Sequence, residues 1–376
     1  MGLIFFWPFL GGKRSGDASH ESAAAAAASA PTDAGREALI KAAAEAAQAC
    51  VLGRWDLILE RARTAAEPGS DRLHLFVWTL FTAFDALETD DHRGALRAFF
   101  ESGRDVRFGE LFTVGAGGWL MDWPTLRVAL FDYVSQRDPE LAREIAVGLL
   151  QARPEEPGEW ALALRELVRG RPYATWDSLA RVRLQEFIHD PAWAAHGAAG
   201  WMEGFDLVVA IGTPEPLADL AALSAQNDAR SARFVAFLTA DRLVMAAPAP
   251  CLAALNQDPS LFSGATGVRA GLFARCDVRD PAQVAELEAY FLRGDVGPGE
   301  RAQFAAAFPQ LSAAPTHRLL TTPVVRSEAE IHAAEASTLA LLATWIESAR
   351  YPTWTPTFVE IQRRLQSRVT PAPATS

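Results

Sequence analysis

Apolar residues recur every three or four positions through most of the chain, a spacing that places them on one face of an α-helix. Segment 126–136 shows this pattern with Val128, Phe131 and Val134, and it ends at Asp138-Pro139. Proline disfavours a helical conformation for the residue before it, yet it suits the first turn of a new helix, which the aspartate can cap. The pattern therefore predicts two helices that meet almost without a loop.

The same aspartate–proline signal returns at Asp190-Pro191, Asp258-Pro259 and Asp280-Pro281. The apolar periodicity predicts short helices over residues 125–136, 139–151, 158–169, 175–189, 191–211, 215–225, 229–240, 250–257, 260–274, 281–292 and 299–308. Short connections make consecutive helices antiparallel neighbours. We therefore predict an all-α fold of stacked antiparallel helical hairpins, with the main array over residues 123–320.

A separate helical region is expected over residues 33–122, beginning with a helix that Asp33 caps and that ends near Cys50. A glycine turn with aromatic, acidic and apolar residues at helical spacing comes next: Gly53, Trp55, Asp56, Leu57, Ile58, Leu59, Ala62, Ala65 and Pro68. This resembles the turn and second helix of a tetratricopeptide repeat. A second copy is expected, with a first helix over 73–87 and a turn at 90–92.

Two helix openings in the middle of the chain resemble the second helix of a HEAT repeat. They are Asp138-Pro139-Glu140-Leu141 and the segment 228–233, in which an acidic residue precedes small and aliphatic residues. The resemblance implies an α-solenoid, a fold whose stacked hairpins commonly serve as a binding surface for other proteins.

Residues 108–123 interrupt the helical rhythm with the glycine-rich run 115–118. A dinucleotide-binding loop would need glycine at position 120, where Leu120 stands, and a strand leading into the run. We therefore expect a bend between helices or a close helix contact here, which glycine permits.

The C-terminal region, residues 321–369, begins with a break at Thr321-Thr322-Pro323. Ser327 and Glu330 are spaced as a capping box for a helix that reaches about Arg350, and Thr355-Pro356 opens a last helix. We expect this pair of helices to cap the array, and residues 370–376 to form a loose tail.

The N-terminal segment, residues 1–32, consists of an apolar tip and a linker rich in alanine, serine and glycine. The tip, residues 3–10, is too short and too broken by Pro8 to span a bilayer. Its aromatic residues are candidates for contact with a partner or a membrane interface: Phe5, Phe6, Trp7 and Phe9. Of two readings, insertion into the protein's own core or a neighbouring subunit is favoured over a peripheral membrane contact.

Charge and cysteine usage narrow the environment and the partners. The net charge of −11 argues against nucleic acid, because binding to phosphates relies on clustered basic residues. Only three cysteines occur and they are widely spaced, so neither a disulfide framework nor a zinc site is indicated. A cytoplasmic location, with membrane association as the alternative, is the expectation.

Candidate chemistry is sparse. Glu186 and His189 have the spacing that places a carboxylate and an imidazole on one helix face, as in helical metal sites, but the further copies that such sites need are missing. Solvated charges at a helix end are therefore the favoured interpretation, and we expect no cofactor. The sequence contains no nucleophile elbow, Walker loop or metalloprotease motif.

The eleven tryptophans are expected mainly in the core and at hairpin corners rather than in a sugar or peptide groove. Together these features favour a non-catalytic scaffold that binds an unidentified protein or peptide. The alternatives are an all-helical enzyme, perhaps dependent on a metal, and a peripheral membrane adaptor.

Overall fold

The computed structural model describes residues 53–66, 72–109, 111–226, 230–312, 318–322 and 324–369, together with Lys41, Glu45 and Ala49. This described part is all-α apart from one short hairpin. The first elements are α3 (Trp55–Ala65), α4 (Arg72–Asp85), α5 (Thr89–Glu101), β1 (Thr113–Val114), η1 (Ala116–Gly118), β2 (Leu120–Asp122), α6 (Leu126–Arg137), α7 (Pro139–Ala152), α8 (Pro157–Val168), η2 (Tyr173–Thr175), α9 (Ser178–Ile188) and α10 (Pro191–His196). There follow α11 (Trp201–Gly204), α12 (Asp206–Ile211), α13 (Leu217–Ser224), α14 (Arg230–Ala246), α15 (Pro248–Gln257), α16 (Thr266–Phe273), α17 (Pro281–Phe291), α18 (Pro298–Ala307), α19 (Glu328–Ser348) and α20 (Thr355–Val369).

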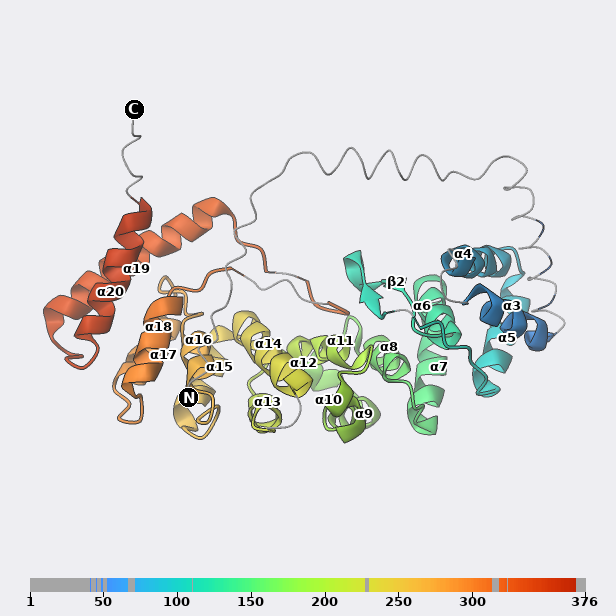
Figure 1. The fold of residues 1–376 in the computed structure, drawn as a ribbon, viewed down its shortest axis with the longest axis horizontal. Coiled ribbons are helices and arrows are strands. Elements are labelled where there is room, and N and C mark those ends of the chain that lie inside the picture. The colour runs from blue at the N-terminus through green and yellow to red at the C-terminus, as the bar shows by residue number, and fades with distance from the viewer. Residues whose placement is uncertain are drawn as a thin grey trace, which may run out of the picture.

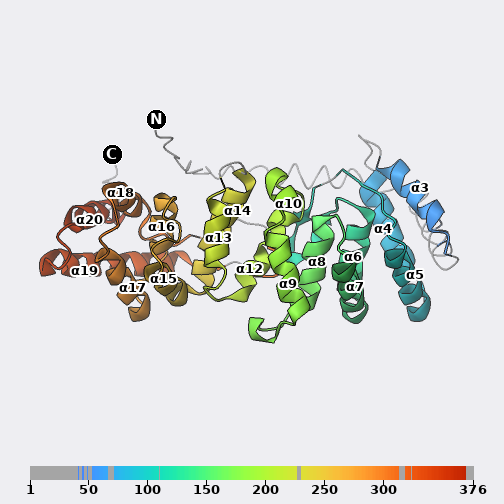
Figure 2. The same ribbon diagram turned by 90° about the horizontal axis from the view of Figure 1, so that it is seen from below.

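The helices lie in sequence order along one curved row (Figure 1). Helices two apart in the chain pack against each other, as α6 does with α8, α12 with α14, α14 with α16 and α16 with α18. These even-numbered helices form a layer on the inner side of the curve, which faces the β-hairpin. Helices α7, α9, α13 and α15 lie on the outer side, which Figure 2 shows from below.

Three of the four aspartate–proline signals open helices as predicted. The side chains of Asp138, Asp190 and Asp280 accept hydrogen bonds from backbone N–H groups in the first turns of α7, α10 and α17. The prediction is wrong at Asp258, which follows the end of α15. Its carboxylate accepts the backbone N–H of Ser260 at 2.9 Å, which makes a local turn, and the next helix begins only at Thr266.

The single helix predicted over residues 191–211 is three short helices, α10, α11 and α12. Two glycines in the left-handed region interrupt it, Gly197 with φ +59° and Gly200 with φ +86°. A Cβ at position 200 would lie 2.5 Å from the Cα of Gly158. Gly200 therefore lets the chain turn directly against the start of α8, a contact that apolar periodicity cannot predict.

The predicted bend at residues 115–118 is instead part of an antiparallel β-hairpin. Thr113 pairs with Asp122, and the N–H of Gly115 donates to the carbonyl of Trp119 at 2.7 Å. The hairpin projects on the inner side of the curve (Figure 1). It lies between α5 and α6 in the sequence but does not part them in space, since α4 packs against α6 and α5 against α7.

The two helices expected for the second copy are present as α4 and α5, although the turn between them was misplaced. Residues 90–92 lie within the first turn of α5 rather than before it. The predicted apolar residues of α5 are buried: Ala95, Leu96, Phe99 and Phe100. Most of the helix predicted from Asp33 to Cys50, including both residues, lies outside the described part of the chain.

Ion pairs that are largely buried link successive even-numbered helices of the inner layer, or link α14 to the loop after α16 in the case of Arg275. These pairs are Arg127–Glu159, Arg165–Asp132, Arg242–Asp206, Arg275–Asp241 and Arg269–Glu300. Burial disfavours the charged form of a carboxyl and raises its pKa, whereas the paired arginine and hydrogen bonds act in the other direction. The carboxyls with a raised pKa are those of Asp132, Asp241 and Glu159. Removing one partner of such a pair leaves an uncompensated buried charge.

At the C-terminal end, the predicted capping box of α19 is present, because Ser327 and Glu330 each accept a backbone N–H from the other. Helix α20 packs against α18 and α19. Arg364 lies in the middle of α20 and donates to the carbonyls of Ala305, Ala306 and Phe308. The arginine therefore caps the end of α18 rather than the end of its own helix.

Candidate functional site

Residues 308–312, 318–322 and 324–327, which together we call the strap, lie between α18 and α19 in the sequence. They lie across the inner side of the row (Figure 1). The helices mostly pack against helices that are close to them in the sequence. The strap differs, because it also contacts residues that are far away from it in the sequence.

The loop 274–277, after α16, holds the outgoing limb of the strap. The N–H of Gln310 donates to the carbonyl of Ala274 at 2.8 Å. The guanidinium of Arg275 donates to the carbonyls of Gln310 and Ser312. These contacts bind backbone groups of the strap, so they depend little on its side chains.

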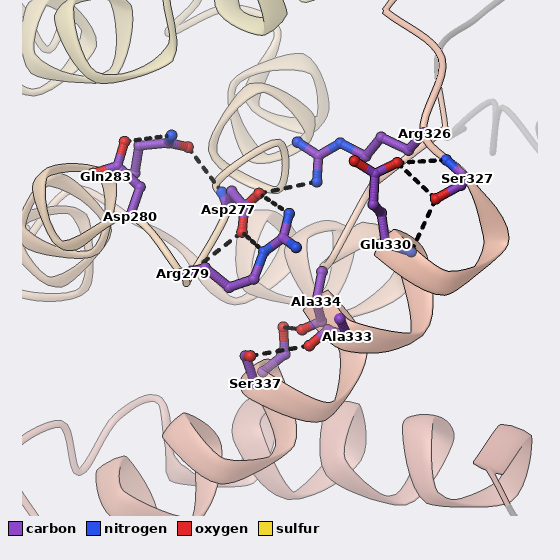
Figure 3. Close-up of polar contacts among 11 residues, drawn as sticks. Asp277, Arg279, Asp280, Gln283, Arg326, Ser327, Glu330, Ala333, Ala334 and Ser337 are labelled. Atoms are coloured by element: carbon purple, nitrogen blue, oxygen red, sulfur yellow. Dashed lines mark hydrogen bonds and ion pairs between the residues drawn. The ribbon is translucent and has the colours of Figure 1, made fainter.

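The same loop holds the returning limb through Asp277. The carboxylate lies 3.1 Å from a guanidinium nitrogen of Arg326 and 2.6 Å from one of Arg279 (Figure 3). Hydrogen bonds from Arg279, supported by the charge of Arg326, lower the pKa of Asp277 to about 2. The carboxylate is therefore ionised at neutral pH, and both limbs are anchored on one loop.

The tip of the strap, residues 319–321, is held by Asp206, the first residue of α12. This carboxylate accepts the backbone N–H groups of Leu320 at 2.6 Å and Thr321 at 2.7 Å. The hydroxyl of Thr321 and the guanidinium of Arg242 also donate to it. Asp206 is completely buried and Leu319 nearly so, so the tip is inserted into the molecule.

The donors around Asp206 come mainly from the strap. A carboxylate offers about four acceptor positions, and here the tip supplies three donors while Arg242, on α14, supplies the fourth. Burial, together with the charge of nearby Arg318, lowers the pKa of Arg242 to about 10, so it stays protonated at neutral pH. A buried carboxylate needs such donors, because an unsatisfied one is costly.

The β-hairpin forms the opposite wall of the tip site through Gly118. Its φ of +80° lies in the left-handed region, and a Cβ there would come within 2.3 Å of the carbonyl oxygen of Leu319. The carbonyl of Gly118 accepts a hydrogen bond from Arg165 on α8 at 2.6 Å. Glycine is therefore needed here both for its conformation and for the close approach of the strap.

A buried polar network supports this wall. Arg165, which is completely buried, donates to Asp132 at 3.2 Å and to Glu166 at 2.7 Å. The guanidiniums of Arg165 and Arg169 lie 5.1 and 4.3 Å from the ring centre of Trp119. The network connects α6, α8 and the hairpin, and thus keeps Gly118 in position.

A small cleft lies between the limbs of the strap and helices α14 and α15. Its walls include Met245, Arg275, Asp277 and Arg326, and its volume is about 60 Å³. Pockets for small organic ligands usually measure about 300–1,000 Å³. This cleft therefore holds a few water molecules at most.

The residues predicted as weak metal candidates lie at the end of α9, away from the strap: Glu186 is in its last turn and His189 directly follows it. The carboxylate of Glu186 is bound by Arg153 at 2.9 Å and by Arg183 at 2.5 Å. His189 is exposed, with Nε2 3.4 Å from Asp219. Within the described part of the chain, no group of three or more His, Cys, Asp or Glu side chains is placed to hold a metal ion.

The aromatic residues predicted for partner or membrane contact, Phe5, Phe6, Trp7 and Phe9, lie outside the described residues. Among the helices that are described, none has both the length and the apolar character needed to cross a bilayer. Among the tryptophans that the structure describes, those buried in the core are Trp55, Trp123, Trp160, Trp176, Trp201, Trp345 and Trp354. Trp78 on α4 was not anticipated as a surface residue and is 58% exposed.

The sequence analysis missed the residues of the tip site. Asp206 looks like an ordinary acidic residue in the first turn of a helix, and Arg242 looks like a single charged residue within a largely apolar stretch of helix. One signal was present, since Thr321-Thr322-Pro323 was identified as a break in the helical pattern. Nothing local connects that break to α12.

Comparison with known proteins adds no assignment. No family model matches the chain, and neither the curated proteins nor the solved structures include a match.

Proposed function

We propose that this protein is a non-catalytic scaffold that binds an extended segment of another protein or peptide on the inner side of the helical row. We also propose that the row is an irregular α-solenoid, as the resemblance to HEAT and tetratricopeptide repeats implies. The observation that carries the proposal is the strap itself. An extended stretch of chain already lies on this side, and it is bound mainly through its backbone.

Backbone recognition supports a peptide as the ligand. Peptide-binding surfaces commonly gain affinity from main-chain hydrogen bonds and specificity from pockets for a few side chains. The inner side combines both, because Asp206 binds two N–H groups of the tip while Leu319 is buried beside them. The cleft of about 60 Å³ beside the strap favours this function over the turnover of a small metabolite.

Composition supports the same proposal for partner and location. The net charge of −11 favours partners other than nucleic acid. Cys251 and Cys276 are buried free thiols, and burial raises the pKa of Cys251 to about 12, which keeps that thiol protonated and unreactive. We therefore place the scaffold in the reducing cytoplasm.

The proposal is tested by selecting ligands from a random peptide library on the immobilised full-length protein and measuring their affinity by calorimetry. Two exposed positions give a matched pair of variants: Met121→Ser on β2, which is 62% exposed on the hairpin, and Val182→Ser on α9, which is 53% exposed. We expect selected peptides to lose at least threefold in affinity with Met121→Ser and to be unaffected by Val182→Ser. Failure to select any ligand, or the reverse pattern, would contradict the proposal.

A further inference from the structure

We infer that the tip of the strap occupies, within its own chain, a binding site for a Leu-x-Thr/Ser segment of a partner protein, and that the partner must displace the tip to bind. This inference rests on the proposed scaffold function and assigns its ligand and its site. The site consists of Gly118 on the hairpin, Asp206 on α12 and Arg242 on α14.

The contacts of the tip define the chemistry of the ligand. Asp206 accepts two consecutive backbone N–H groups, at 2.6 and 2.7 Å, and this requires an extended segment without proline at either position. The hydroxyl of Thr321 donates to Asp206 and accepts from Arg242 at 2.9 Å. A serine or threonine at this position can make both contacts, because a hydroxyl is both donor and acceptor.

The residue two positions before the hydroxyl must be apolar, and its backbone must fit closely against Gly118. Leu319 is only 1% exposed, and its carbonyl lies so close to Gly118 that no Cβ fits between them. By contrast, Leu320 is half-buried, so the residue between the two recognised positions is less restricted. The site therefore reads an apolar residue, a variable residue, and then serine or threonine.

Release of the tip is physically reasonable because its contacts with Asp206 and Arg242 are polar. Water or the backbone of another peptide can replace donors to Asp206, whereas a buried aromatic cluster has no such replacement. Only Leu319 of the described strap between residues 318 and 327 is fully buried, while Val324 and Val325 are exposed. The anchors on the loop 274–277 would keep the limbs in place while the tip leaves.

A tethered tip competes strongly with a free ligand. A short tether gives an effective concentration in the range of about 1 mM, and the apparent affinity of a ligand falls with the fraction of molecules in which the site is open. A partner therefore displaces the tip only if it outcompetes this effective concentration. It can do so through higher affinity, through additional contacts or through a high local concentration.

The test uses a fluorescein-labelled synthetic peptide that reproduces residues 316–324 and reads binding by fluorescence anisotropy. Binding is compared for the full-length wild type, for the double variant Leu319→Ser/Thr321→Val, which weakens the internal tip, and for the control Val325→Ser. Val325 is 81% exposed, so its replacement changes the strap without changing the tip. We expect the double variant to bind the peptide at least tenfold more tightly than the wild type, and the control to match the wild type.

Two altered peptides examine the recognition itself. One carries N-methyl groups on the amides of Leu320 and Thr321, which removes both N–H donors, and the other carries Leu319→Ser and Thr321→Val. Each is expected to bind the double variant at least tenfold more weakly than the unaltered peptide. Equal binding of all three peptides, or equal affinities of the double variant and the wild type, would overturn the inference.

If the double variant does not fold, the wild type answers the same question by hydrogen exchange. Saturating peptide should accelerate exchange of the strap amides at residues 318–322, and unchanged exchange would refute displacement. The inference and the scaffold function can fail separately. Library-selected peptides that bind but do not compete with the strap peptide would refute this site and leave the scaffold function standing. Binding of the strap peptide without any library ligand would refute the scaffold function and leave this site standing.

Discussion

Two joints of the inner layer each pair a buried arginine with a buried carboxylate, but in different ways. At the joint between α16 and α18, Arg269 and Glu300 form a two-pronged ion pair at 2.8 and 2.7 Å. The hydroxyl of Tyr290 donates to the same carboxylate at 2.9 Å, and the carbonyl of Pro259 accepts from Arg269 at 3.0 Å. All these partners come from neighbouring elements of the row, so this joint is complete in itself.

At the joint between α12 and α14, Asp206 and Arg242 are also buried, yet three of the donors to the carboxylate belong to the strap tip. These contacts join residues that are far apart in the sequence, since Leu320 lies 114 positions after Asp206. The comparison teaches that a buried arginine–carboxylate ion pair between two helices can serve two purposes. It closes the first joint permanently, and it leaves the second joint open to a segment of extended chain.

The largest effect is expected at the closed joint. Glu300→Gln removes the charge that faces Arg269, which is 2% exposed, and should lower the free energy of unfolding by about 3–5 kcal/mol. Urea denaturation measures this loss. Glu360→Gln, at an exposed position of α20, is the control and should change stability by less than about 0.5 kcal/mol. A loss below about 1 kcal/mol for Glu300→Gln would show that the ion pair of this joint contributes little to the free energy of unfolding.

A matched pair of hydroxyl deletions compares the joints directly. Tyr290→Phe and Thr321→Val each remove one hydroxyl that donates to a buried carboxylate. Burial raises the pKa of Tyr290 well above its usual value, so this hydroxyl stays protonated. We expect Tyr290→Phe to cost about 1.5–3 kcal/mol in the free energy of unfolding and Thr321→Val less than about 1 kcal/mol, since the tip can yield and water can hydrate Asp206. Equal losses in urea denaturation would contradict an exchangeable tip.

A methyl group at Gly118 should loosen the tip specifically. Gly118→Ala introduces a side chain at φ +80° and within 2.3 Å of the carbonyl of Leu319, so either the hairpin or the tip must shift. We expect a loss on the order of 1 kcal/mol in the free energy of unfolding and at least tenfold faster hydrogen exchange at the amides of Leu320 and Thr321. Gly148→Ala on α7, where the added Cβ meets nothing within 4 Å, should leave tip exchange unchanged.

The smallest effect concerns pH. The folded pKa of Asp277, about 2, lies below its unfolded value of 3.8. A group with a lowered pKa contributes stability that is complete above the unfolded pKa and is lost as pH falls towards the folded pKa. We therefore expect the difference in Tm between the wild type and Asp277→Asn to be constant above pH 5 and to shrink between pH 4 and pH 2. A difference independent of pH over that window would show that the charge of Asp277 does not hold the returning limb.

Local chemistry explains which parts of the fold could be predicted. Asp138, Asp190 and Asp280 satisfy N–H groups within three residues of themselves, so their role is written in the adjacent sequence. The capping box of Ser327 and Glu330 is equally local. The error at Asp258 arose because the same side chain can close a turn as readily as it can cap a helix.

The candidate site could not be predicted because its contacts are distant in sequence. Apolar periodicity indicates which face of a helix is buried, but not which segment covers it. Asp206 has no partner among its near neighbours in sequence, and Gly118 was judged by its effect on its own loop rather than by the strap that approaches it. The same limit applies to Glu186 and His189. Their spacing predicts a shared helix face, but it does not show that Arg153 and Arg183 bind the carboxylate of Glu186.

The order in which the tip site is synthesised has a consequence for the life of the nascent chain. Gly118, Asp206 and Arg242 all leave the ribosome before the tip does, and the 114 residues between Asp206 and Leu320 take roughly 6–23 s to translate at about 5–20 residues per second. During that interval Asp206 has none of its three strap donors. A partner present at the ribosome therefore meets the site before its internal competitor exists.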